Sequence, residues 1–153
     1  LIDQLGEKLD TNAEMTELRR TQQGQLEEAE AETLQDIVDA YHFYKEENDE
    51  KALRDVLYPI EKAVSHLRKV VVKDSAVNAV ANGADLGAAG ISQLQDGIDE
   101  GEQIAIMTLK GELIALAEAQ MTSEKMYDSD ETAATLNSVH MDPETYPKRW
   151  KQE

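Results

Sequence analysis

The fold of this chain is decided by residues 69–91, which read KVVVKDSAVNAVANGADLGAAGI. The three valines at positions 70–72 are β-branched, and such a run favours a strand. Asp74 or Ser75 is expected to cap a short helix after that strand, because both side chains accept hydrogen bonds from a first helical turn. Gly83 stands where a left-handed C-terminal cap would end the helix. We therefore expect a strand, a short helix and a glycine-rich loop within this stretch.

A β-hairpin and a closing strand are expected farther along the chain. Residues 104–108 alternate between two faces as a strand does, and Lys110-Gly111 supplies a turn into the apolar residues 113–116. Residues 132–141 can supply a further strand. The second half of the chain is therefore predicted to be a small mixed β-barrel with short helices.

The first half of the chain has a helical pattern. Three helices are expected: one over residues 1–9, one from Thr33 to about Lys45 whose cap includes Asp36, and one that begins at Asn48 or Asp49. Pro59 interrupts the last pattern. Residues 15–24 read as extended chain that ends at a glycine. The pattern changes at about Lys69, so a domain boundary is predicted between residues 68 and 69.

The net charge of −17 is distributed evenly along the chain. Residues 1–68 hold 17 acidic and 8 basic side chains, and residues 69–153 hold 15 and 7. Phosphate binding normally needs Lys and Arg, so this charge by itself argues against a nucleic-acid partner. An even acidic coat is also typical of a protein that stays soluble in concentrated salt, where electrostatic repulsion is screened. The two interpretations are a salt-adapted protein and an ordinary acidic cytosolic protein without an RNA partner.

Several kinds of site are not expected. The chain has no cysteine, which excludes disulfides, thiol catalysis and cysteine zinc sites. His42, His66 and His140 are scattered, so we expect no metal and no cofactor. No apolar stretch approaches the roughly 18 residues that a membrane span needs, and a cytoplasmic location is expected.

Motifs in the second half resemble the PUA domain, an RNA-binding module. KDSAV at residues 73–77, NGADL at residues 82–86 and the pair Gly90-Ile91 are similar to its first strand, helix and RNA-facing loop. GEQIAIMT at residues 101–108 resembles its central hairpin. YPKRW at residues 146–150 resembles the terminus of the archaeal H/ACA-type pseudouridine synthase. Ala89 departs from the family, which often has a proline there.

Motifs in the first half resemble the dyskerin-like, TruB-type pseudouridine synthases. AEMTELRRT at residues 13–21, followed by Gly24, is similar to their last conserved catalytic-domain motif, and YHFYKE at residues 41–46 fits the same family. The resemblance implies an α+β chain with a PUA-type mixed β pseudo-barrel and short helices over residues 69–153. Residues 1–68 would be a mostly helical remnant of the α/β catalytic domain.

The resemblance also implies a function. The full-length protein would isomerise uridine to pseudouridine in rRNA or tRNA, guided by an H/ACA RNA whose lower stem and ACA trinucleotide the PUA domain holds. Small accessory proteins of the H/ACA ribonucleoprotein would be partners. The family's catalytic aspartate lies upstream of this sequence, so the chain is expected to be inactive alone.

The candidate site residues follow from the resemblance and from the glycine spacing. Leu18 is carried over as an active-site wall, with plain core packing as the alternative. Glycines let a phosphate or a base approach backbone amides closely, and cations contact phosphates. The RNA-binding candidates are Lys69, Lys73, Gly83, Ala84, Asp85, Leu86, Gly87, Ala89, Gly90, Lys148, Arg149 and Lys151. Trp150 would close the barrel or stack on RNA.

Two other functions remain open at this point. One is the PUA domain of a different tRNA-modifying enzyme, such as a base-exchange transglycosylase. The other is a non-enzymatic acidic module that binds RNA or protein. Arg19, Arg20 and Thr21 with Gly24 argue against the transglycosylase.

Overall fold

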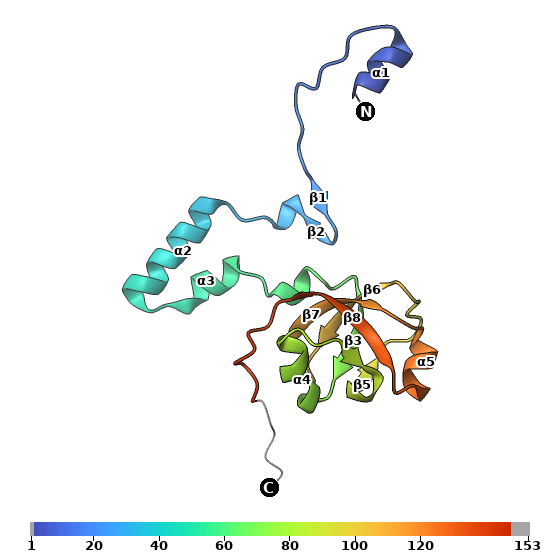
Figure 1. Cartoon of the computed structure of the whole chain (residues 1–153). Helices are drawn as coiled ribbons and strands as arrows, with labels where there is room; N and C mark the ends of the chain where they lie inside the picture. The colour runs from blue at the N-terminus through green and yellow to red at the C-terminus, as the bar shows by residue number, and fades with distance from the viewer. Residues whose placement is uncertain (1, 148–153) are drawn as a thin grey trace. The chain divides into compact units, whose positions relative to one another are not determined.

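The computed structural model describes residues 2–147 of the chain, which divides into two units, Leu1–Leu57 and Tyr58–Glu153 (Figure 1). None of the helices formed by the described residues combines the length and the apolar character that a bilayer-spanning helix requires.

The first unit is mainly helical, as its sequence predicts. It contains α1 (Ile2–Leu9), β1 (Gln22–Gln23), β2 (Leu26–Glu27), the 3-10 turn η1 (Glu28–Glu30), α2 (Leu34–Glu47) and α3 (Glu50–Val56). Thr33 and Asp36 form a capping box at the start of α2, and Asp49 caps α3. The predicted capped start of α2 is therefore confirmed, and the helix runs two residues past the predicted end at Lys45.

The first unit buries little apolar surface. Gly6 and Ala40 are its buried residues among those described, while Leu34, Val38 and Tyr41 on α2 are exposed. Stability of a small domain depends on apolar area removed from water. The described part of this unit therefore lacks a core that would hold it folded alone.

The second unit is a mixed sheet with two short helices. Its elements are η2 (Ile60–Lys62), β3 (Arg68–Val72), α4 (Asp74–Ala81), β4 (Leu86–Gly87), η3 (Ala88–Gly90), β5 (Ile91–Leu94), β6 (Gln103–Met107), β7 (Leu113–Ala119), α5 (Ser123–Asp128) and β8 (Thr132–Val139). The strand order is β4-β8-β7-β6-β3-β5, with β3 and β6 parallel and the other neighbours antiparallel. The predicted hairpin and closing strand are confirmed.

The connection between the two edge strands shows that the sheet closes on itself. Only the three residues of η3 join β4 to β5, the strands at opposite edges of the order. A flat sheet of this order would place its edges about 24 Å apart. The link from Gly87 to Ile91 reaches at most about 14 Å. The sheet must therefore curl into the near-barrel that Figure 1 shows.

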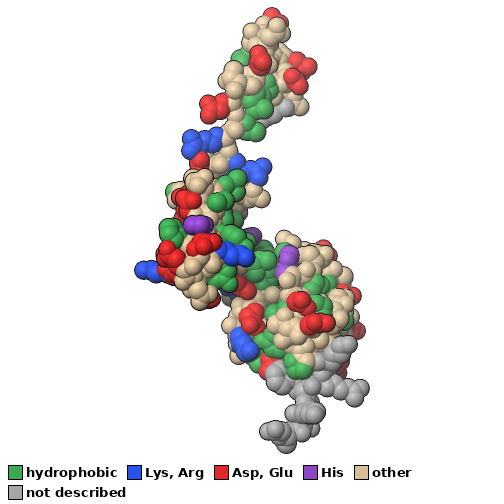
Figure 2. Space-filling view, turned by 90° about the vertical axis from the view of Figure 1, so that its left-hand side faces the viewer, with side chains coloured by type: hydrophobic (Ala, Val, Ile, Leu, Met, Phe, Trp, Pro, Cys, Tyr) green, Lys and Arg blue, Asp and Glu red, His purple; other side chains and the backbone are tan. Residues whose placement is uncertain are grey.

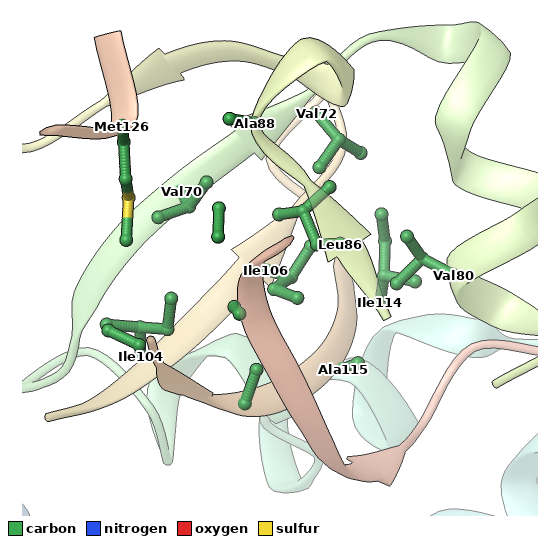
Figure 3. Packing of buried hydrophobic residues seen from close by; sticks show 14 of the residues in the cluster. Val70, Val72, Val80, Leu86, Ala88, Ile104, Ile106, Ile114, Ala115 and Met126 are labelled. Carbon is green, nitrogen blue, oxygen red and sulfur yellow. The ribbon is translucent and has the colours of Figure 1, made fainter. Parts of the chain in front are cut away.

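The interior of the barrel is filled by small and aliphatic side chains. Figure 3 shows Val80 of α4 beside Ile114 of β7, with Val70 and Ile106 from neighbouring strands in the same cluster. Tyr146 is the aromatic member of this cluster among the described residues. The low aromatic content of the sequence thus corresponds to a core in which aliphatic side chains do most of the packing.

Residues 58–67, which we call the strap, belong to the second unit. Val64 is buried against Ala105, Met107 and Leu113 of the hairpin. The Glu61 carboxylate accepts a hydrogen bond from the Leu113 backbone N–H at 2.8 Å. The compact unit therefore begins at Tyr58, eleven residues before Lys69, where the sequence pattern changes.

The end of the described chain is tied to α4 and to the β6–β7 turn. Asn78 donates from its side-chain amide to the carbonyl oxygens of Pro143 and Tyr146, at 3.0 and 3.1 Å. The Tyr146 hydroxyl donates to Glu112 at 2.5 Å, and Thr108 donates to the same oxygen at 2.9 Å. These bonds hold residues 143–146 on the barrel.

Candidate nucleic-acid interface

Helix α4 positions the residues of the predicted site. Its N-cap residue is Lys73, whose side chain makes no capping hydrogen bond, so the prediction that Asp74 or Ser75 caps the helix is wrong. Lys73 has extended backbone geometry, and its N–H donates to the Gly90 carbonyl at 2.9 Å. Lys73 thus separates β3, which ends at Val72, from α4, whose first helical residue is Asp74.

The C-terminal end of α4 closes with a Schellman motif at Gly83. Gly83 has φ +92, its N–H donates to Val80 at 2.9 Å, and the Ala84 N–H donates to Ala79 at 3.0 Å. The predicted left-handed cap is confirmed. The expectation that the Gly83 amide is open to a ligand is wrong, because Val80 already accepts from it.

The turn after α4 is exposed, but the residue that follows it is not. Residues 82–85 are all exposed to solvent. The Asp85 carboxylate accepts a hydrogen bond from the Leu136 N–H at 2.9 Å, which fastens the turn to β8. Leu86 is 2% exposed and packs in the barrel core. Among the predicted RNA-binding residues 83–87, Leu86 therefore has a packing role in this structure.

The other end of the predicted loop lies at the start of α4. Ala89 is exposed, and its carbonyl accepts a hydrogen bond from the Lys73 ammonium at 2.8 Å. A Cβ at Gly90 would lie 3.2 Å from side-chain atoms of Ala76 and of Leu86, closer than ordinary van der Waals contact, so these neighbours would have to shift to admit a side chain. Gly87 has φ −77 and pairs with β8, which any residue could do.

The predicted loop residues thus divide into two groups. Helix α4 has eight residues, so its ends are about 12 Å apart. Asn82, Gly83, Ala84 and Asp85 lie at its C-terminal end. Lys73, Ala89 and Gly90 lie at its N-terminal end. A ligand that touches both groups has to extend along the helix.

The predicted cations have different surroundings. Lys69 is half-buried in β3, where its N–H donates to the Gln95 side chain at 2.9 Å. Lys73 is exposed beside Ala89. Lys148, Arg149 and Lys151, together with Trp150, lie outside the described residues. Arg68, which was not predicted, pairs with Glu102 at 3.2 Å.

Asn82 is the functional candidate that sequence reasoning missed. Its side-chain amide donates to the Asn78 carbonyl at 2.7 Å, so the side chain is fixed at the exposed turn. The signal available in the sequence was an asparagine directly before a helix-ending glycine, which places a polar side chain at the C-cap.

Leu18, the candidate active-site wall, is 81% exposed in a segment without regular structure. Within residues 2–147, no cluster of His, Cys, Asp and Glu has the composition of a metal site. Acidic side chains are scattered over the face shown in Figure 2 and do not gather in one patch.

The two parts of the chain match two known protein families. Residues 1–65 match the tRNA pseudouridylate synthase B C-terminal domain, and residues 68–138 match the PUA domain. The chain is 47% identical over 154 residues to a probable tRNA pseudouridine synthase B of Methanocaldococcus jannaschii. The match covers 100% of this chain and 46% of the relative. The chain is also 50% identical over 152 residues to the protein of the same description from Pyrococcus horikoshii, covering 98% and 46%.

The chain matches the C-terminal half of the archaeal TruB-like pseudouridine synthases. A solved structure of the archaeal box H/ACA sRNP Nop10-Cbf5 complex is similar with a TM-score of 0.84 and 46% identity, covering 96% of this chain and 48% of that one. A structure of an H/ACA RNP bound to a substrate RNA containing 2'-deoxyuridine gives a TM-score of 0.80 and 47% identity, covering 96% and 47%. The chain spans about half the length of the curated relatives that it matches.

Proposed function

We propose that this chain is the RNA-binding C-terminal part of a pseudouridine synthase that isomerises uridine to pseudouridine in rRNA or tRNA, guided by an H/ACA RNA. The observation that carries the proposal is similarity to TruB-like relatives along both parts of the chain, at 47–50% identity. A PUA domain alone would fit several RNA-modifying enzymes. The match of residues 1–65 to the TruB C-terminal domain favours this family over a transglycosylase or a non-enzymatic module.

The two parts of the chain have different proposed roles. Residues 1–68 are the end of a catalytic domain, with Leu18 as a wall of its active site, and the catalytic aspartate belongs to the half of the relatives that this chain does not cover. The chain alone is therefore inactive. Residues 69–153 are the PUA domain and hold the lower stem and the ACA trinucleotide of the guide.

The RNA contacts are proposed along α4 and the chain that follows Tyr146. The exposed turn at Gly83, Ala84 and Asp85 takes bases, while Lys73 takes a phosphate. Lys69, Gly87, Ala89 and Gly90 are proposed as further contacts. Lys148, Arg149 and Lys151 add phosphate contacts. This assignment is supported by the exposure of the turn and by the ammonium group beside Ala89.

The proposed partners are accessory proteins of the H/ACA particle. Nop10 and Gar1 are bound to Cbf5 in solved complexes that this chain resembles. We propose proteins of the same kind for the full-length protein. We also propose a salt-adapted archaeal source and a cytoplasmic location, because 32 acidic residues stand against 15 basic ones. In molar salt the Debye length is about 3 Å, so the acidic side chains on the surface do not repel RNA at longer distances.

The proposal is tested by fluorescence anisotropy of a labelled hairpin with a 3′ ACA tail, in molar KCl. We expect at least tenfold tighter binding than to the same hairpin ending in UGU. Lys73→Gln is expected to weaken binding to both tails. Lys125→Gln is the matched control, because α5 lies away from α4 on the barrel (Figure 1). Equal binding of both tails would overturn the guide-RNA assignment.

A further inference from the structure

The chain that follows β8 is fastened to α4 by one side chain, Asn78. Residues 148–151, which we call the basic segment, come directly after the fastened residues and include Lys148, Arg149 and Lys151. We infer that Asn78 is a positioning residue for RNA binding, because it sets the point from which the basic segment reaches phosphates. This inference rests on the proposed function, in which these cations contact RNA, and names the residue that places them.

The side-chain amide of Asn78 holds two main-chain carbonyls at once. Its Nδ2 donates to the oxygens of Pro143 and Tyr146, at 3.0 and 3.1 Å. An amide nitrogen carries two hydrogens, so these bonds use its full donor capacity. The acceptors lie 65 and 68 residues after Asn78 in the sequence. Figure 1 shows the chain after β8 passing α4, and Asn78 is the side chain that joins the two.

Tyr146 is also held through its side chain. The residue is 7% exposed and belongs to the barrel core, and its hydroxyl donates to Glu112 at 2.5 Å. The Lys110 ammonium lies over the ring, 5.3 Å from the centroid. The backbone of Tyr146 is thus held by α4 and its ring by the β6–β7 turn. Movement of this residue would break contacts on both sides.

Pro147 limits how the chain can leave this position. A proline ring fixes its own φ near −65°, and its contact with the preceding residue disfavours a helical conformation there. Few free rotations therefore remain between the held Tyr146 and the start of the basic segment.

The basic segment is the densest group of cations in an acidic sequence. Three of its four residues are Lys or Arg, in a chain with 15 basic and 32 acidic residues. A cation on a free chain end loses conformational entropy when it binds a phosphate, and this loss weakens binding. Asn78 reduces the loss, because it holds the chain up to Tyr146 in one place before RNA binds.

The test measures affinity of the full chain for the ACA hairpin between about 0.5 and 1.5 M KCl. Asn78→Asp keeps the size of the side chain but replaces the donor with a carboxylate oxygen, which repels both carbonyls. We expect about threefold weaker binding in the lower salt. The slope of log affinity against log KCl should become shallower by about one, the contribution of a single phosphate contact. Lys125→Gln on α5 changes the net charge equally and should keep the wild-type affinity and slope.

A double-mutant cycle separates positioning from a direct role of Asn78. In a chain with Lys148→Gln, Arg149→Gln and Lys151→Gln, Asn78→Asp should have no further effect, because it acts through these cations. The full loss in that background, or no loss in the wild-type background, would overturn the inference. Wild-type affinity of the chain with three glutamines would do so too, while the guide-RNA assignment stands. Failure of the wild-type chain to bind the hairpin would overturn both.

Asn78→Ala covers the case in which Asn78→Asp does not fold. It removes both donors without adding a charge and suits a helix. We expect a wild-type circular dichroism spectrum together with the same change in affinity and slope. A folded Asn78→Ala chain that binds as wild type does would contradict the inference. An unfolded one would show that Asn78 maintains the barrel itself, which would also contradict it.

Discussion

Gly83 and Gly87 lie four residues apart, yet only one of them needs to be glycine. Gly83 has φ +92, in the left-handed region that side chains with a Cβ disfavour, although no atom lies within 4 Å of the site where a Cβ would be. Gly87 has φ −77, and a Cβ there would lie 4.0 Å from the Glu131 carbonyl oxygen. The backbone angle, and not the available space, distinguishes the two positions.

Gly83→Ala is expected to lower the free energy of unfolding by about 1 kcal/mol, because alanine must adopt a left-handed conformation. Gly87→Ala is the control and should change it by less than about 0.5 kcal/mol. Urea denaturation followed by circular dichroism measures both. Equal destabilisation by the two substitutions would contradict the assigned conformations.

Glu112 makes the stability of the second unit depend on pH. Hydrogen bonds from Tyr146 and then Thr108, helped by the charge of Lys110, lower the pKa of Glu112 below its ordinary value of 4.5 despite partial burial. A group with a lowered pKa in the folded state contributes stability above its unfolded pKa. That contribution is lost as the pH falls through the folded pKa.

Tyr146→Phe keeps the buried ring and removes the hydroxyl that donates to Glu112. We expect the unfolding free energy near neutral pH to fall by about 1 kcal/mol. The difference from wild type should narrow as the pH drops below 4.5, because the unfolded chain then becomes protonated at Glu112 while the folded chain keeps the carboxylate until the pH falls through its lowered pKa. Urea titrations at several pH values test this, and a difference that stays constant down to pH 3 would refute the role of Glu112.

At the scale of elements, the strap and the hairpin depend on each other. The strap covers Ala105, Met107 and Leu113 with Val64 and supplies the acceptor for the Leu113 N–H. Its sequence contains Pro59 and only a short apolar pattern, so sequence reasoning grouped it with the preceding helices. Its packing partners lie about 40–50 residues later in the chain. The periodicity of apolar residues is a local pattern and does not predict such distant partners.

A fragment of residues 58–153 is therefore expected to be more stable than a fragment of residues 69–153. Loss of the strap removes the Val64 contacts and leaves the Leu113 N–H without Glu61, which together cost about 3 kcal/mol. Thermal unfolding of both fragments measures the difference. In the longer fragment, Glu61→Ala should give part of the loss, while Glu124→Ala on α5 should give almost none. Equal melting temperatures for the two fragments would show that the strap is dispensable.

At the scale of the whole chain, the acidic surface predicts a response to salt. With 32 acidic and 15 basic residues, repulsion within the folded chain is strong at low ionic strength. Raising KCl from 0.1 M to 2 M shortens the Debye length from about 10 Å to less than 3 Å. We expect the melting temperature to rise by about 5 °C or more, as stabilisation by a few kcal/mol would produce.

Scanning calorimetry at both salt concentrations tests this expectation. A variant with several exposed carboxylates of the second unit changed to amides serves as the control, because its response to KCl should be smaller. A melting temperature that is flat or falls with KCl would contradict salt adaptation and favour an ordinary acidic protein.

The sequence by itself determined strands β3, β6, β7 and β8, the hairpin turn, the start of α2 and the helix end at Gly83. These features depend on residues within a few positions of one another: β-branched runs, capping side chains and a glycine at a left-handed position. Only the tertiary structure decided that Gly90 and Leu86 pack inward and that Asp85 is held by Leu136. It also decided that the turn at Gly83 is exposed to solvent. Burial and hydrogen bonds of this kind depend on contacts between segments that are far apart in the chain. A local sequence pattern therefore does not predict them.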